Sequence, residues 1–84
     1  WGANIDQTFV TVSSCADGFT ASPLMIGTDL YVADGCGKVY RIDTTTATVA
    51  TIANLGNQKL YDLSYDGVYL YVGSSRGRFS AIAL

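Results

Sequence analysis

The side chains of this chain that could do chemistry are aspartates, cysteines and tyrosines. Its 84 residues contain seven carboxylates, all from aspartate, and no histidine or glutamate. General acid–base catalysis needs a group that titrates near the working pH, and histidine is the side chain that does so unperturbed. A paired-carboxylate site of the glycosidase kind would have to be assembled across subunits, and nothing in the spacing of the aspartates requires one. We therefore predict no catalytic residues and a protein that is not an enzyme.

One short segment, Asp34-Gly35-Cys36-Gly37, has the polar character of a cation-binding loop. It carries a single carboxylate and lacks the Asp-x-Asp-x-Asp-Gly spacing of a calcium loop. Two cysteines without histidine cannot fill a four-ligand zinc site. The glycine pair precedes no helix, so it indicates a hairpin turn and not a phosphate cradle. The sequence predicts neither a metal nor a cofactor.

The two cysteines, Cys15 and Cys36, lie in segments rich in Gly, Ser and Asp. An even cysteine number, polar surroundings and low charge fit an exported protein, extracellular or periplasmic, with one disulfide. Two unpaired, partly buried thiols are the alternative. The first residue is Trp1, which is expected either when a leader has been removed or when the chain is a fragment.

Charge limits the partners. The net charge is −2 and the five basic residues are scattered, so no basic stripe exists to neutralise a phosphate backbone. No polybasic or amphipathic anchor is visible, and no apolar run approaches the roughly 18 residues of a membrane span. We expect no nucleic-acid partner and no membrane insertion.

Six tyrosines are the other distinctive feature, and three of them lie on strands predicted to occupy equivalent places: Tyr31, Tyr69 and Tyr71. One interpretation is that these rings pack between sheets. The other is that they form a candidate binding surface for a glycan or a protein, since tyrosine combines a large apolar area with a polar tip.

Period-2 alternation of apolar and polar residues dominates the chain and predicts an all-β fold. Val, Ile, Thr and Tyr are common, as expected of strands. Short turns with Gly and Asp separate the segments and suit antiparallel neighbours. The predicted strands span residues 8–13, 24–26, 30–33, 38–42, 48–52, 61–65, 68–72 and 78–82.

The chain is an internal repeat, because residues 30–43 recur 40 residues later as 70–83. A period of 40–45 residues is the length of one four-stranded propeller blade. With strands lettered A to D from the innermost outward, the chain reads D-A-B-C, D-A-B-C. We predict one β-repeat module over residues 1–84, with unit 1 at about 1–43 and unit 2 at about 44–84.

In this frame residues 8–13 form a D strand, which belongs beside a C strand. No predicted C strand directly precedes residues 8–13 in the sequence. Closure of two units on themselves is sterically implausible, and native proteins avoid unpaired strand edges. The expected partner is the C strand of another copy or of a larger β-propeller chain.

The repeat resembles the blades of quinoprotein-like and NHL/YVTN-type β-propellers over roughly residues 22–84. The motif is Asp29-Leu30-Tyr31-Val32-Ala33-Asp34-x-x-Gly37-Lys38-Val39-Tyr40-Arg41-Ile42-Asp43-x-x-Thr46. The second copy has Ala83 in place of the terminal Asp, and the quinoprotein Gly-Lys-x-x-x-Trp element is absent, with residues 47–52 in its place. The resemblance implies that D–A and B–C connections emerge on one face, so Cys15 and Cys36 could meet there.

Our first hypothesis is a non-enzymatic extracellular module, structural or binding, that self-assembles by edge-strand completion. A ring forms if the rotation closes, and a fibre forms if it does not. The alternatives are a fragment or subunit of a larger quinoprotein-like propeller enzyme, and a lectin-like propeller.

Overall fold

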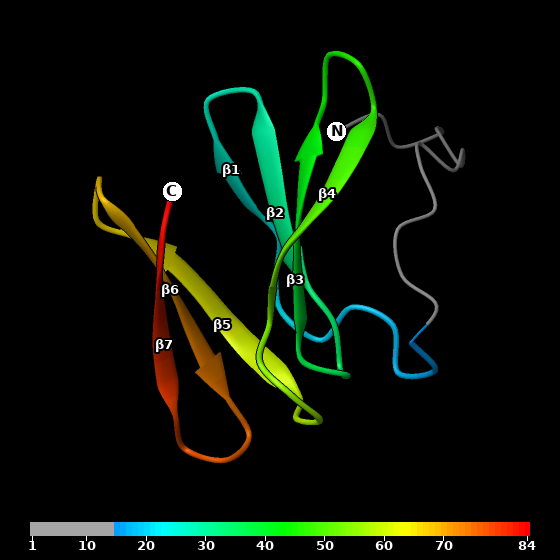
Figure 1. The fold of residues 1–84 in the computed structure, drawn as a ribbon, viewed down its shortest axis with the longest axis vertical. Coiled ribbons are helices and arrows are strands. Elements are labelled where there is room, and N and C mark those ends of the chain that lie inside the picture. Colours follow the sequence, from blue (N-terminus) through cyan, green and yellow to red (C-terminus); the bar gives the residue numbers. More distant parts are fainter. Residues whose placement is uncertain (1–14) are drawn as a thin grey trace.

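A computed structural model describes residues 15–84, and within them the chain is all-β without a helix (Figure 1). The predicted strand 8–13 lies outside the described residues. The strands are β1 (Leu24–Ile26), β2 (Asp29–Ala33), β3 (Lys38–Asp43), β4 (Thr48–Asn54), β5 (Leu60–Tyr65), β6 (Tyr69–Ser74) and β7 (Phe79–Ala83). The other predicted strands are thus confirmed, with ends that move by one or two residues. In the described range, no helix is long and apolar enough to cross a membrane.

The strands form two antiparallel sheets of unequal size. The first has the order β1-β2-β3-β4 and the second the order β5-β6-β7. Figure 1 shows them as two neighbouring layers that β4 and the loop after it connect. Each connection between neighbouring strands is short, as the alternation of strands and Gly/Asp turns in the sequence predicts. The first sheet therefore has one strand more than the second among the described residues.

The sequence repeat is also a repeat of strand register. Each partner pair of β2 and β3 reappears between β6 and β7 with both residue numbers raised by 40. For example, Leu30↔Ile42 in the first sheet corresponds to Leu70↔Ile82 in the second. The turns match as well, because the Asp34 N–H donates to the Lys38 carbonyl at 3.0 Å and the Ser74 N–H to the Arg78 carbonyl at 2.9 Å. Equivalent residues of the two units can thus be compared directly.

The main core lies between the two sheets. Side chains of one face of the first sheet pack against one face of the second, since alternate residues of a strand point to the same side. The buried members of this cluster are Ala21, Tyr31, Ala33, Val39, Leu60, Leu70 and Val72. A second cluster, on the opposite face of the first sheet, contains Val32, Tyr40 and Ile42.

The segment before β1 is held to both sheets. The Thr20 N–H donates to the Ala33 carbonyl at 3.1 Å, and its hydroxyl donates to the Leu60 carbonyl at 2.6 Å. Phe19 forms an isolated bridge with Asp34, and its ring meets Tyr40 edge-on at 6.4 Å between centroids. These contacts fix residues 15–23 against the end of the first sheet where the cysteines lie.

Candidate interaction surface

One edge of the second sheet has no partner among residues 15–84. β7 pairs with β6 on one side only, whereas its counterpart β3 pairs with β2 and also with β4. The Ser74 N–H bonds to the Arg78 carbonyl, and backbone groups alternate in direction along an antiparallel strand. The N–H and C=O groups of Phe79 and Ala81 therefore point away from β6. A row of such groups is a template for another strand.

The first sheet shows how this kind of edge is satisfied. There the Leu55 N–H donates to the Gly37 carbonyl at 2.7 Å, just beyond the pairing of β4 with β3. Gly77 is the counterpart of Gly37, and both have a positive φ, of 70° and 90°. A Cβ added at Gly37 would lie 1.6 Å from the Gly56 carbonyl oxygen, whereas one at Gly77 would meet nothing within 4 Å. Beside β7, no described residue fills the space that β4 and its following loop fill beside β3.

One face of the second sheet carries exposed aromatic rings. We call it the outer face, and it carries Tyr69, Tyr71, Gly73, Phe79 and Ala81. Phe79 is 76% exposed and Tyr69 is 42% exposed. The Phe79 ring lies over Gly73, since a Cβ added there would be 2.9 Å from Cε1 of the ring. An exposed aromatic group of this kind is typical of an interaction surface.

The three tyrosines of the predicted binding surface do not lie together. Tyr69 and Tyr71 are neighbours, with ring centroids 6.3 Å apart and planes at 52°. Tyr31 is 3% exposed and packs in the core between the sheets, where burial raises the pKa of its hydroxyl. The prediction must be corrected for Tyr31, because the second sheet covers the face on which it lies. Tyr69 and Tyr71 remain as exposed or half-buried rings.

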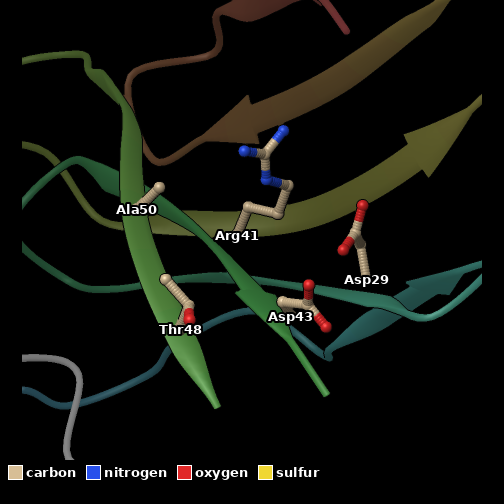
Figure 2. Close-up of a pocket in the computed structure, with 5 residues that line it drawn as sticks. All are labelled: Asp29, Arg41, Asp43, Thr48 and Ala50. Carbon is tan, nitrogen blue, oxygen red and sulfur yellow. The ribbon is translucent and has the colours of Figure 1, made fainter. Parts of the chain in front are cut away.

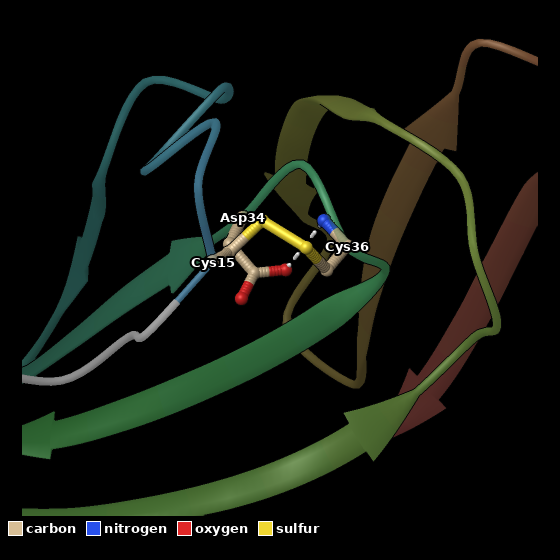
Figure 3. Close-up of side chains that lie close together, drawn as sticks. All are labelled: Cys15, Asp34 and Cys36. Carbon is tan, nitrogen blue, oxygen red and sulfur yellow. Dashed lines mark hydrogen bonds between the residues drawn. A yellow bond between two sulfur atoms is a disulfide. The ribbon is translucent and has the colours of Figure 1, made fainter.

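The predicted disulfide is present between Cys15 and Cys36 (Figure 3), with an Sγ–Sγ distance of 2.08 Å and a sequence separation of 21. It ties the segment before β1 to the turn between β2 and β3. The alternative of two free thiols is thereby excluded for this structure.

Asp34, beside the disulfide, has the role of a turn aspartate and is buried, with 1% exposure. Its carboxylate accepts the Cys36 N–H at 3.0 Å, the Lys38 N–H at 2.9 Å and the Tyr40 hydroxyl at 2.9 Å. Buried carboxylates need such partners. Asp34 thus organises the turn that carries Cys36.

The side chains of Cys15, Asp34 and Cys36 are close enough for a metal site, with candidate ligand atoms within 4.8 Å of one another. The thiolate is the form of cysteine that binds metals, and here the two sulfur atoms are joined to each other. The oxidised cluster therefore lacks the donor set that a metal would need, and it acts as a covalent link.

A second aspartate, Asp66, organises the turn before β6 in a similar way but at the surface. Its carboxylate accepts the N–H groups of Val68 and Tyr69, each at 2.8 Å, and the Tyr71 hydroxyl at 2.7 Å. These bonds, the Tyr69 N–H first, lower the pKa of Asp66. The same contact with Asp66 raises the pKa of Tyr71. The bonds also hold Val68 in the turn, so β6 begins one residue later than predicted.

An open cleft of about 380 Å³ lies over the far end of the first sheet (Figure 2). Asp29 and Asp43 are direct partners in the β2–β3 register, and Arg41 projects beside them. Thr48 and Ala50 of β4 complete the lining. The sequence reasoning missed this group, although residues equally distant from Cys36 in the turn are the expected partners in this hairpin.

The cleft places two carboxylates and a guanidinium beside a hydroxyl group. Its hydroxyl group, on Thr48, shares a 2.7 Å hydrogen bond with the Thr46 hydroxyl and not with a carboxylate. A hydroxyl nucleophile requires a base within hydrogen-bond reach to activate it. The cleft thus offers charges of both signs and hydrogen-bonding groups.

Comparisons with known proteins add no relative. No protein-family model, no curated protein and no solved structure matches the chain significantly.

Proposed function

We propose that the chain is a non-enzymatic, extracellular β-repeat structural module that self-assembles by edge-strand completion. Residues 8–13 of one copy add to β7 of the next as its missing fourth strand. The observation that carries the proposal is the unequal pairing of two equivalent strands. β3 has β4 beside it, whereas no described residue lies in that place beside β7. β-strand addition to an exposed edge is a recurrent mode of recognition.

The sequence supports this choice of strand. Residues 8–14 read Thr-Phe-Val-Thr-Val-Ser-Ser, and residues 48–54, which contain β4, read Thr-Val-Ala-Thr-Ile-Ala-Asn. At the 40-residue offset both threonines coincide, and the apolar residues between them fall at the same places. A segment that resembles β4 fits the edge of a strand that matches β3.

A head-to-tail contact of this kind is heterologous. Each copy has one strand to offer and one edge to fill, so copies either close into a ring or continue as a fibre. The disulfide supports an extracellular or periplasmic setting, in which such bonds persist. The resemblance to propeller blades makes a ring the closed form that we expect.

Proline at Ala81 tests the edge directly. The Ala81 N–H points away from β6, so Ala81→Pro removes a donor from the open edge and leaves the β6–β7 bonds in place. We expect the variant to stay folded and to become monomeric. The matched control is Met25→Pro on β1, whose N–H points to the free side of the first sheet. Assembly that survives Ala81→Pro would contradict the proposal.

A second candidate is a fragment or subunit of a larger β-propeller enzyme of the quinoprotein-like class. The register repeated at 40 residues favours it, because a longer array would continue the same pattern. In that case a later strand of the same chain would fill the edge of β7. Mass spectrometry of the native protein for a longer precursor, together with absorbance of a copurifying quinone, distinguishes this candidate. A lectin-like role would require glycan binding on an array, with loss on Tyr69→Ala.

A further inference from the structure

The two units bury equivalent faces to very different extents. In the first sheet, the face that carries Tyr31, Ala33 and Val39 is covered by the second sheet, and all three are buried. In the second sheet, Tyr71, Gly73 and Phe79 occupy the same register positions on the outer face. Val39 has no exposed surface, whereas Phe79 is 76% exposed. The second unit thus presents a face that the first unit covers with a sheet.

The path of the chain indicates what would cover this face. β4 pairs with β3, and the loop that follows it leads into β5, the first strand of the covering sheet. A neighbouring copy whose residues 8–13 pair with β7 would continue through residues 14–23 into its own first sheet. Since β4 leads through a loop to the sheet that covers the first unit, residues 8–13 would likewise lead to a sheet that covers the second unit. The first sheet of the neighbouring copy would then lie over the outer face.

We propose that the outer face of the second sheet binds the first sheet of a second copy, with Phe79 as its central contact. This inference rests on the proposed self-assembly and names its second contact, a face in addition to the edge. The repeat also relates the sides of the two sheets. The side of the first sheet that corresponds to the core-facing side of the second sheet carries the second apolar cluster. The three buried members of that cluster are only 3–5% exposed, so its half-buried rim residues, Leu30 and Val49, are the apolar surface that it offers to a second copy.

The aromatic side chains of the outer face suit a protein contact. Phe79 and Tyr69 supply aromatic area, while the small, exposed Ala81 lets another sheet approach closely beside them. None of these three residues carries a charge, and the exposed Asp62 of β5 lies on the same face beside Gly73. Aromatic side chains at the centre of a contact are the ones whose removal weakens it most.

Photocrosslinking from position 79 tests the inference. Phe79 is replaced by p-benzoylphenylalanine, which keeps an aromatic ring there, and the variant is mixed with isotopically labelled wild-type chain. We expect crosslinks between labelled and unlabelled chains, from position 79 to peptides within residues 24–54. The same probe at Val68, which is 60% exposed in the turn before β6, is the control and should give none. Crosslinks to residues 60–84 of the second copy, or no intermolecular crosslinks, would overturn the inference.

A pair of threonine variants measures the contribution of the ring. Phe79→Thr keeps strand propensity and removes the apolar group, and we expect it to weaken assembly by about tenfold or more. Val68→Thr changes a similarly exposed residue and should leave assembly unchanged. Equal assembly of the two variants would contradict the inference. Ala81→Pro could abolish assembly while the probe at position 79 gives no crosslinks to residues 24–54 of a second copy. In that case strand completion stands and the face contact alone is wrong.

Discussion

Val39 and Phe79 occupy the same position in two successive repeats, yet one is fully buried and the other is 76% exposed. Each lies directly opposite the residue six positions before it, Ala33 for Val39 and Gly73 for Phe79. The side chains of the two pairs differ in size. In the core, Ala33 lies beside the medium-sized Val39, whereas on the surface Gly73 lies beneath the large ring of Phe79. The difference in burial arises because, among residues 15–84, a second sheet covers only the first pair.

The two turn glycines Gly37 and Gly77 should differ sharply on substitution. Both have a positive φ, so alanine at either site costs about 1–2 kcal/mol. At Gly37 the added Cβ would also collide with the Gly56 carbonyl, and the backbone would have to move. We expect Gly37→Ala to lower the free energy of unfolding by at least about 3 kcal/mol. Urea denaturation of both variants measures this, and equal losses would contradict the packing described.

Asp34 and Ser74 are a second informative pair. Asp34→Ala removes the carboxylate that accepts the Tyr40 hydroxyl and two turn N–H groups, and we expect a loss of about 3 kcal/mol. Ser74→Ala removes only a 3.4 Å bond from the Arg76 N–H, and we expect less than about 0.5 kcal/mol. Thermal and urea unfolding test the difference. A small effect of Asp34→Ala would mean that the turn holds itself without the carboxylate.

The Asp66–Tyr71 bond predicts a pH dependence. The pKa of Asp66 is lower in the folded chain than its ordinary value of 3.8, so the unfolded chain binds more protons in this range. The stabilisation is complete above pH 3.8 and is lost as the pH falls through the lowered pKa. The pKa of Tyr71 is raised above 10.0, so its contribution is present below pH 10 and is lost as the pH rises through the raised value.

Two variants isolate this pH effect. Urea unfolding from pH 2 to 7 should show a stability difference between wild type and Asp66→Asn that is largest near neutrality and disappears at the acid end. Tyr71→Phe should reduce the acid dependence in part, because the Tyr69 and Val68 N–H groups remain. A difference that does not change with pH would show that Asp66 has no lowered pKa.

The Cys15–Cys36 bond should stabilise the isolated chain measurably. It closes a loop with a sequence separation of 21, for which the loss of unfolded-state entropy is worth about 3 kcal/mol. We expect the double variant Cys15→Ser/Cys36→Ser, or reduction of the wild type, to lower the unfolding midpoint. Calorimetry with and without reductant measures it, and the double variant in reductant is the control. An unchanged midpoint would show that the bond adds no stability.

Much of the fold can be predicted from the sequence because its determinants are local. Apolar residues alternate through the strands, and Gly and Asp mark the turns, as at Asp34 and Gly37. The repeat of residues 30–43 predicts that equivalent strands pair alike, as the register confirms. Val68 was misplaced because the Asp66 carboxylate extends the turn by one residue.

The candidate surfaces could be predicted only in part, because burial depends on what lies over a face. Tyr31 and Tyr71 have nearly identical neighbours in sequence, and only the placement of the second sheet separates a buried ring from a half-buried one. Asp29, Arg41 and Asp43 belong to the repeat motif, but only the hairpin register shows that they line one cleft. The disulfide was predictable because both cysteines lie in connections at the same end of the first unit.

The molar mass in solution is the most direct test of self-assembly by edge-strand completion. Size-exclusion chromatography with light scattering should be run on the oxidised 84-residue chain at micromolar concentration, beside Ala81→Pro. The proposal predicts a wild-type mass that is a multiple of the 8.9 kDa chain mass and a variant mass of one chain. A folded wild type with the mass of one chain would contradict it.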